Sequence, residues 1–327
     1  MNHPNMTRLK AEVETQMTSF LRKWPADSDG GLYDPIHYLM SLGGKRLRAI
    51  LALSVSEAEG GQLEEAIPVA LAVELFHNFT LMHDDIMDEA PMRRGHPTVH
   101  TRWNSNAAIL SGDAMYTMAG MAMAETSPQA LPAALKLFNQ TALEVCIGQQ
   151  SDMAFELRSE VSLSEYMEMI RLKTSVLVAA SMSLGALASG MSDERVKLWY
   201  AIGEKLGMAF QMQDDLLDAF GNEETGKQVG GDILSDKKTF LRIYAWAHAN
   251  QEQRDRIGNW DGRSDDPKRK IKDVTEVMLE VKADVAARRH MQEFTDDALK
   301  YLDALSLEES HRKWMSYLVG LVSARNN

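Results

Sequence analysis

An all-α fold is predicted from three features of this sequence. Apolar residues recur with a helical period along most of the 327-residue chain. Runs of alternating β-branched residues separated by hairpin turns, the pattern typical of strands, are absent from the sequence. No Ser/Gly/Pro-rich linker or low-complexity tract interrupts the chain. We therefore predict a single all-helical domain over residues 1–327.

The predicted helices begin and end at recognisable signals. The first carries the apolar stripe Leu9, Val13, Met17 and Phe20 and ends before Pro25 and a turn-rich segment. A Gly-Gly pair closes the second, and Pro91 stops the third. In chain order the predicted helices cover residues 9–21, 47–58, 64–89, 107–124, 132–151, 164–190, 192–220, 239–249, 270–305 and 309–324.

Composition and termini exclude several classes of protein. The formal net charge of −12 argues against a nucleic-acid backbone as the main partner, which would need a basic face. We find no apolar stretch long enough to span a bilayer, and residues 1–6 lack the apolar core of a signal peptide, so we expect a cytoplasmic protein. Cys146 is the single cysteine and lies in an apolar run, which favours a packed thiol without chemistry.

An acidic pattern occurs twice, as Asp84-Asp85-Ile86-Met87-Asp88 and as Asp214-Asp215-Leu216-Leu217-Asp218. Residues four apart share a helix face, so the outer carboxylates of each copy point in one direction and repel one another unless a cation binds. Mg²⁺ prefers oxygen ligands and accepts one or two carboxylates per ion, with phosphates completing its shell. One copy alone would be an ordinary solvated acidic face. Two copies, each after a strongly apolar run, predict a metal-diphosphate site.

Three basic clusters complement these acids. They are Gly43-Gly44-Lys45-Arg46-Leu47-Arg48, Arg93-Arg94-Gly95-His96-Pro97, and Lys227 with Lys237-Lys238. Arginine's planar fork matches phosphate oxygens in pairs, and lysine acts as a mobile point charge. Each cluster alone would be a solvated charge run. The second, however, follows Asp88 by little more than one helical turn, which places cations beside the metal-binding acids.

The ordered set of motifs resembles the trans-isoprenyl diphosphate synthases, the family of farnesyl and geranylgeranyl diphosphate synthases. The match covers roughly residues 43–239. Its elements are residues 43–48, His77, residues 81–88, residues 93–95, Gly148-Gln149 with Asp152, Lys173-Thr174, residues 210–218, residues 225–227, and Gly231-Asp232 with Lys237.

The resemblance implies the isoprenoid synthase fold, in which helices surround a large central cavity and the two acidic helices face each other, usually in a homodimer. It implies that Lys45, Arg48, His77 and Arg94 bind isopentenyl diphosphate. It assigns the Mg²⁺ ions, as a cluster, to Asp84, Asp88 and Asp214, with Asp85, Asp215 and Asp218 beside them. The resemblance assigns binding of the allylic diphosphate to Arg93, Lys173, Thr174, Gln211, Lys227 and Lys237.

The implied reaction is a head-to-tail condensation. An allylic diphosphate ionises, the double bond of isopentenyl diphosphate attacks the carbocation, and a proton leaves to give a product five carbons longer. The departing pyrophosphate is the expected base, since no His-acid pair is evident. The cavity must be dry, because water would quench the cation. Residues 223–236, glycine-rich and polar, are expected to close over the metals as a lid.

Other functions remain open but fit less well. A class I terpene cyclase normally has Ser or Thr and then Glu where this chain has Asp218 and Asn222, and it lacks Lys45, Arg48 and Arg94. A head-to-head synthase of the squalene type is disfavoured for the same reason. A non-catalytic regulatory subunit would have a decayed acidic motif, and both are intact. An acidic helical scaffold would gain no thermal stability from Mg²⁺ and a diphosphate.

Product length is expected to depend on bulky residues upstream of Asp84. In the family, the fifth residue before the first Asp commonly sets it; here this is Phe79, with the smaller Thr80 next to it. We favour the twenty-carbon geranylgeranyl diphosphate, with farnesyl diphosphate as the alternative. At about 100° per residue, Thr80 lies nearer than Phe79 to the stripe of Asp84, so the floor of the cavity could be shared with Phe76. Core packing is the competing role for Phe79.

Overall fold

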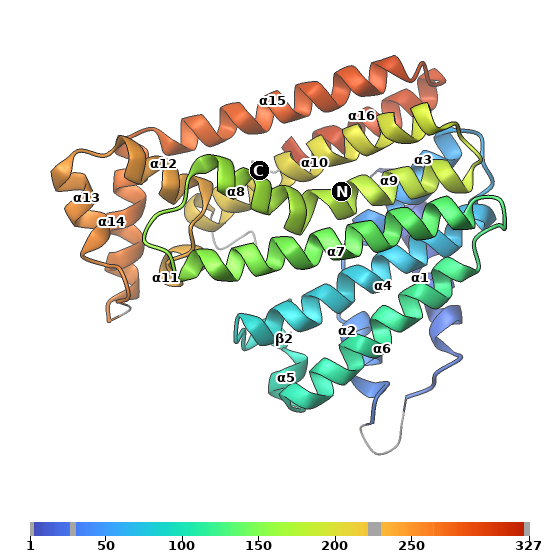
Figure 1. Ribbon diagram of the computed structural model, residues 1–327, viewed down its shortest axis with the longest axis horizontal. Helices are drawn as coiled ribbons and strands as arrows, with labels where there is room; N and C mark the ends of the chain where they lie inside the picture. Colours follow the sequence, from blue (N-terminus) through green and yellow to red (C-terminus); the bar gives the residue numbers. More distant parts are fainter. Residues whose placement is uncertain (1–2, 27–30, 222–229, 264, 324–327) are drawn as a thin grey trace. The chain divides into compact units, whose positions relative to one another are not determined.

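The computed structural model describes residues 3–26, 31–221, 230–263 and 265–323, and helices dominate this part of the chain (Figure 1). The all-α prediction is confirmed. The elements are α1 (Pro4–Leu21), α2 (Asp34–Ser41), α3 (Leu47–Ala58), α4 (Leu63–Met87), β1 (Met92–Arg93), β2 (His96–Pro97), α5 (Val99–Arg102), α6 (Ser105–Ala124), α7 (Leu131–Glu156), α8 (Leu163–Ile170), η1 (Arg171–Ser175), α9 (Val176–Ala188), α10 (Asp193–Phe220), α11 (Gly231–Leu234), α12 (Phe240–His248), α13 (Gln251–Gly258), α14 (Pro267–Glu280), α15 (Ala283–Ala304) and α16 (Glu309–Ser323).

The chain divides into two compact units. The first comprises Met1–Asn139, Ala180–Tyr200 and Leu307–Trp314, and the second comprises Gln140–Ala179, Ala201–Ser306 and Met315–Asn327. By connectivity, helices α7, α9, α10 and α16 each continue from one unit into the other. A single domain over residues 1–327 stays a prediction.

The core of the first unit is built around α4. This helix packs along α6 and α3, and α1 packs against α3 and α4 (Figure 1). Its residues are buried on nearly every side from Ala66 to Phe76, as expected of a helix that is apolar all round. Glu74 is the exception in that run, a carboxylate with a nearly inaccessible side chain. Beyond this run the helix becomes accessible again toward its C-terminal end, where the first acidic sequence lies.

The second unit includes the short helices α8, α11 and α12 and the longer helices α14 and α15. α8 begins with a capping box in which Ser162 and Glu165 bond each other's backbone N–H groups. α12 packs against α8, α14 and α15, while α14 also packs against α11. The side chain of Lys270 on α14 is fully buried and donates to the carbonyl oxygens of Leu234 and Arg263. These bonds attach α14 to the segment that follows the second acidic sequence.

The structure corrects several local predictions. The helix predicted over residues 270–305 is two helices, separated at Lys282, which adopts a left-handed conformation with φ of 60°. Residues 92–97 form a short antiparallel hairpin, although no hairpin was predicted. The helices α2, α5, α11 and α13 were not predicted either, because they are too short to show a clear period.

Two predictions about apolar segments were wrong. The continuous helical stretch Leu163–Ala188 is long and apolar enough, by length and composition, to cross a membrane. Most of its apolar part is nevertheless buried inside the protein, as in the core helix of a soluble protein. Cys146 is exposed rather than packed, because it lies on a face of α7 that no described part of the chain covers.

Candidate active site

The first acidic sequence ends helix α4. Asp88 is the C-cap, and its backbone N–H donates to the carbonyl oxygen of Asp84 over 2.8 Å, so the last turn stays helical and both carboxylates lie on one face. Asp84 is partly accessible and Asp88 is exposed. Asp85, in contrast, is buried and accepts a hydrogen bond of 2.8 Å from Arg93 Nε. Burial raises the pKa of Asp85, and the arginine opposes that shift.

A tight hairpin follows and positions the second basic cluster. Strands β1 and β2 are joined by Arg94 and Gly95, whose φ values are 54° and 78°. Two central residues with positive φ are the mark of a type I′ turn, which matches the twist of paired strands. Arg93 therefore lies on the strand, bonded to Asp85, whereas Arg94 is at the tip of the turn. The Arg-Gly dipeptide was the sequence signal for this hairpin.

The residues assigned to isopentenyl diphosphate come together in the first unit. Arg48, on the first turn of α3, donates from Nη1 to Nε2 of His77 on α4 over 3.0 Å. Burial and the neighbouring arginines, Arg48 first, lower the pKa of His77 well below its usual value, so the imidazole is neutral with its proton on Nδ1. Burial lowers the pKa of Arg48 to about 10, which keeps it cationic at neutral pH. Arg48 Nε is buried and has no hydrogen-bond partner among the described residues, as expected of a donor awaiting an anion.

Arg94 and Lys45 belong to the same group. The Arg94 guanidinium donates to the carbonyl oxygen of Gly43, in the turn that carries Lys45. Gly44 has a φ of 156°, and a Cβ there would lie 3.3 Å from Arg94 Nη2, so glycine leaves room for the guanidinium. Lys45 is exposed beside it. The Gly43–Arg46 turn, the first turn of α3 and the hairpin thus place the cations Lys45, Arg48 and Arg94 around one surface, and α4 adds the neutral His77.

The second acidic sequence lies on α10, in the second unit. Asp215 is buried and accepts hydrogen bonds from Tyr166 Oη at 2.5 Å, Gln211 Nε2 at 3.0 Å and the backbone N–H of Phe240 at 3.3 Å. Burial raises its pKa to about 7 despite the bonds from Tyr166 and Gln211. Asp214 and Asp218 are partly accessible. Asp218 Oδ2 accepts from the backbone N–H of Asp232 at 3.0 Å, which ties α10 to α11.

Most residues assigned to the allylic diphosphate connect to this network. Lys173 and Thr174 lie in the π-helical turn η1, a distortion frequent at functional sites. Lys173 Nζ is 2.5 Å from Asp152 Oδ2, and Thr174 Oγ1 donates to Gln211 Oε1 over 3.0 Å. A Cβ at Gly148 would lie 2.3 Å from the backbone nitrogen of Lys173, so glycine allows α7 to approach η1 closely.

The remaining members of that set are placed differently. Arg93 belongs to the first unit and is bonded to Asp85, whereas Lys173, Thr174 and Gln211 belong to the second unit. Lys237 follows α11, with its backbone N–H bonded to Asp232. Lys227 lies outside the described residues, as does the first part of the predicted lid, residues 223–229. The described end of that segment is anchored, because Asp236 accepts from Lys270, Arg242 and the N–H of Gly262.

The residues predicted to limit chain length lie in an aromatic cluster of the first unit. The Phe79 ring centroid is 5.5 Å from that of Phe76, 5.3 Å from that of Tyr116 on α6 and 4.7 Å from that of His83. Phe76 is buried, Phe79 is half-buried, and Thr80 is half-buried with its hydroxyl bonded to the carbonyl of His77. Phe79 is therefore packed on several sides and yet not sealed in the core.

Two functional partners were missed in the sequence. Tyr166, which holds Asp215, lies seven residues before Lys173 and gave no signal beyond its place in an amphipathic helix. Glu74 was detectable in principle, as the one acidic residue inside the apolar run from Ala70 to Phe76. Among the described residues, no group of three or more His, Cys, Asp or Glu side chains could by itself hold a metal ion. The carboxylates are arranged in pairs, which suits a hard cation that also binds phosphate and water.

Comparison with known proteins agrees with these features. Residues 30–278 match the family of polyprenyl synthetases. The chain is 44% identical over 218 residues to a geranylgeranyl diphosphate synthase of Methanosarcina mazei, covering 66% of this chain and 67% of that protein. It is 38% identical over 293 residues to a geranylgeranyl pyrophosphate synthase of Geoglobus acetivorans, covering 89% of each. A solved geranylgeranyl pyrophosphate synthetase of Pyrococcus horikoshii superposes with a TM-score of 0.92 at 31% identity, covering 98% of each chain.

The chain therefore belongs to the polyprenyl synthetase family, the trans-isoprenyl diphosphate synthases, and is a prenyltransferase. The predicted isoprenoid synthase fold is confirmed. The residue assignments and the central cavity stay predictions.

Proposed function

We propose that this chain condenses isopentenyl diphosphate with an allylic diphosphate, head to tail, and that its main product is geranylgeranyl diphosphate. One observation carries the proposal: in both acidic sequences the middle carboxylate is held by the protein and the flanking ones share a helix face. Arg93 holds Asp85, whereas Tyr166 and Gln211 hold Asp215. A solvated acidic face would not bury its middle residue.

The donor set fits Mg²⁺, and we propose that a cluster of these ions binds at Asp84, Asp88 and Asp214. All three offer carboxylate oxygens, and each acidic sequence supplies two accessible acids one helical turn apart. Bound Mg²⁺ would offset the charge of the diphosphate and stabilise the charge that develops on it as the carbon–oxygen bond breaks. Both acidic sequences are proposed to serve the same reaction, as one catalytic domain.

The protein's own residues would hold and orient the two substrates. Arg48, Arg94, Lys45 and the neutral His77 would bind isopentenyl diphosphate, since cations and a ring N–H suit phosphate oxygens. Lys173 and Thr174 would bind the allylic diphosphate, with Gln211 fixed between Thr174 and Asp215. Arg93, Lys227 and Lys237 are proposed to bind the same diphosphate. Holding the reacting carbons together lowers the entropic part of the barrier.

The chemistry then needs no side-chain nucleophile. The allylic carbon–oxygen bond breaks, and pyrophosphate leaves with the electron pair. The double bond of isopentenyl diphosphate attacks the resulting carbocation, a new carbon–carbon bond forms, and a proton passes to the departing pyrophosphate. The apolar residues beside Asp84, such as Phe76 and Phe79, would keep water from the cation.

Product length can be measured directly. The two curated relatives described above are named for the twenty-carbon product, which supports that length here. Purified protein is incubated with Mg²⁺, isopentenyl diphosphate and, in turn, dimethylallyl, geranyl or farnesyl diphosphate, and the products are sized by mass spectrometry. We expect twenty carbons from every primer. A main product of fifteen carbons would favour the farnesyl alternative.

Phe79→Ala tests the floor of the substrate cavity. Removing the ring beside Tyr116 opens space along α4, so we expect a main product at least one five-carbon unit longer. Phe79→Leu keeps most of the volume and should keep the wild-type product. An unchanged product from a stable Phe79→Ala variant would leave Phe79 as core packing.

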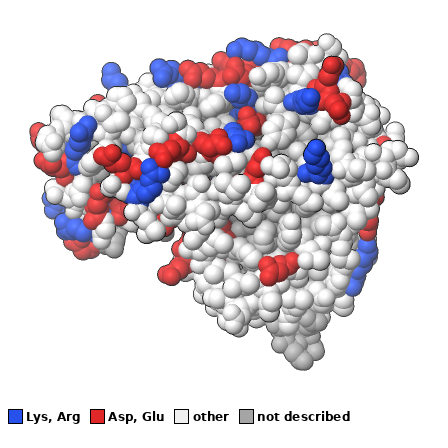
Figure 2. Space-filling view, in the orientation of Figure 1, with Lys and Arg blue, Asp and Glu red and all other residues white. Residues whose placement is uncertain are grey.

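We also propose that the chain forms a homodimer through α6 and α7. Exposed apolar side chains line both helices, and Figure 2 shows few charged side chains over them in that view. These residues are Ile109, Leu110, Tyr116 and Met121 on α6, and Leu135, Leu143, Cys146, Ile147 and Met153 on α7. Exposed apolar side chains of this kind are typical of protein interfaces, and a second copy of the chain is the proposed partner. Light scattering should give twice the mass of 36.6 kDa.

A further inference from the structure

Arg46 differs from the other cations of its turn. Lys45 is exposed and Arg48 is half-buried, but the side chain of Arg46 is only 1% accessible. Its backbone adopts a left-handed conformation, with φ of 50°, at the start of α3. A non-glycine residue is strained in that region and stays there only when its surroundings hold it. A buried side chain of this kind is too enclosed to contact substrate.

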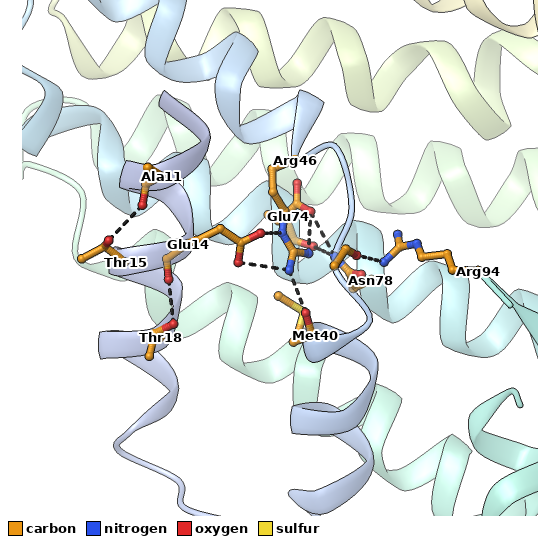
Figure 3. Close-up of polar contacts among 10 residues, drawn as sticks. Ala11, Glu14, Thr15, Thr18, Met40, Arg46, Glu74, Asn78 and Arg94 are labelled. Atoms are coloured by element: carbon orange, nitrogen blue, oxygen red, sulfur yellow. Dashed lines mark hydrogen bonds and ion pairs between the residues drawn. The ribbon is translucent and has the colours of Figure 1, made fainter. Parts of the chain in front are cut away.

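The guanidinium of Arg46 is held from three elements (Figure 3). Nε donates to Glu14 Oε1 on α1 over 2.8 Å, and Nη1 donates to Glu74 Oε1 on α4 over 3.2 Å. Nη2 donates to the carbonyl oxygen of Met40, the second last residue of α2, over 2.8 Å. Burial would lower the pKa of Arg46, but hydrogen bonds and charge from Glu14 and Glu74 outweigh it and raise the pKa. The side chain thus stays cationic and fixed.

These contacts adjoin the residues assigned to isopentenyl diphosphate. Arg46 belongs to the Gly43–Arg46 turn, whose Gly43 carbonyl binds Arg94 and which also carries Lys45. Glu74 is one helical turn before His77 on α4, and its Oε1 also accepts from Asn78 Nδ2. Figure 3 shows Arg94 pointing toward Asn78 on the side of the cluster away from Glu14. The charge of Glu74 also favours the protonated form of Arg48.

We propose that Arg46 is a positioning residue for isopentenyl diphosphate: its bonds to Glu14, Glu74 and Met40 hold the Gly43–Arg46 turn in the left-handed conformation that sets Lys45, Arg48 and Arg94 around one diphosphate. The inference rests on the proposed function. It extends that function to a residue that touches no substrate. Loosening the turn would displace three cations at once, and small misplacements of binding groups weaken binding strongly.

The test compares the two Michaelis constants. Arg46→Gln is expected to raise KM for isopentenyl diphosphate about tenfold, with KM for the allylic primer changed by less than about twofold. Glu14→Gln should raise KM for isopentenyl diphosphate by less, because Arg46 keeps its hydrogen bonds to Glu74 and to the Met40 carbonyl. Arg46→Lys, which retains the charge without the planar fork, should lie between wild type and Arg46→Gln.

Arg195→Gln is the matched control. Arg195 pairs at 2.8 Å with Glu59, whose side chain is 4% accessible, in the same unit and outside the substrate groups. Loss of this ion pair in Arg195→Gln should lower the melting temperature and leave both Michaelis constants unchanged. A purely structural role for Arg46 predicts the same pattern for Arg46→Gln.

Equal changes in both constants, or none, in folded Arg46→Gln and Glu14→Gln would overturn the inference. If Arg46→Gln fails to fold, Glu14→Gln and Arg46→Lys decide it, since Glu14 is 39% accessible and tolerates an amide more readily. Arg94→Ala separates the two proposals. If KM for isopentenyl diphosphate is unchanged in Arg94→Ala, the proposed site is contradicted. If this KM rises in Arg94→Ala but stays unchanged in Arg46→Gln and Glu14→Gln, only the positioning role of Arg46 is contradicted.

Discussion

Asp84→Ala and Asp214→Ala are each expected to reduce turnover by about a hundredfold or more, because a preorganised charge at the developing negative charge is typically worth that much. Both residues are partly accessible at the surface of long helices, so neither carboxylate supports the core. Steady-state turnover with saturating substrates and Mg²⁺ measures the effect, and the melting temperature measures folding.

Asp296→Ala is the control for this pair. Asp296 is an exposed carboxylate on α15 that accepts a hydrogen bond from Gln292. Its removal should leave turnover unchanged. Near-normal turnover of Asp84→Ala or Asp214→Ala would show that the metal ligands are assigned incorrectly.

Arg94→Ala and Lys173→Ala are expected to separate the two substrates. Arg94 lies with Arg48 and His77 in the first unit, and Lys173 lies with Thr174 in the second. Losing a charge-assisted bond to phosphate should raise the Michaelis constant about tenfold to a hundredfold, for isopentenyl diphosphate in Arg94→Ala and for the allylic primer in Lys173→Ala.

Initial rates with each substrate varied in turn measure both constants. If Arg94→Ala instead weakened the allylic primer and Lys173→Ala weakened isopentenyl diphosphate, the two sites would have been exchanged. Lys173 is held 2.5 Å from Asp152, so Asp152→Asn should weaken the same substrate as Lys173→Ala, by a smaller factor.

Local spacing predicted the long helices and the paired acids well, since both depend on residues within one turn of each other. The helices α3, α4, α6 and α10 begin and end within a few residues of the predicted bounds. The break at Lys282 was missed because neither glycine nor proline marks it. The hairpin at residues 92–97 was missed because its strands are only two residues long, so its signal is confined to the Arg-Gly turn.

The side chain that holds the middle acid of each motif could not be predicted. Asp85 and Asp215 occupy the same position in their motifs, yet Arg93 holds the first and Tyr166 the second, eight and 49 residues away. The exposure of Cys146 was misjudged for a related reason. A helical period shows which face of α7 is apolar, but it does not show whether the same chain or another copy covers that face.

Pyrophosphate release tests most directly whether the protein catalyses a metal-dependent condensation of two diphosphates. Purified protein is given geranyl diphosphate with and without isopentenyl diphosphate, in Mg²⁺ and in excess chelator. We predict release only when Mg²⁺ and both substrates are present, with one pyrophosphate for each five-carbon unit added. Release from geranyl diphosphate alone, unaffected by isopentenyl diphosphate, would indicate a cyclase-type ionisation and contradict the proposed condensation.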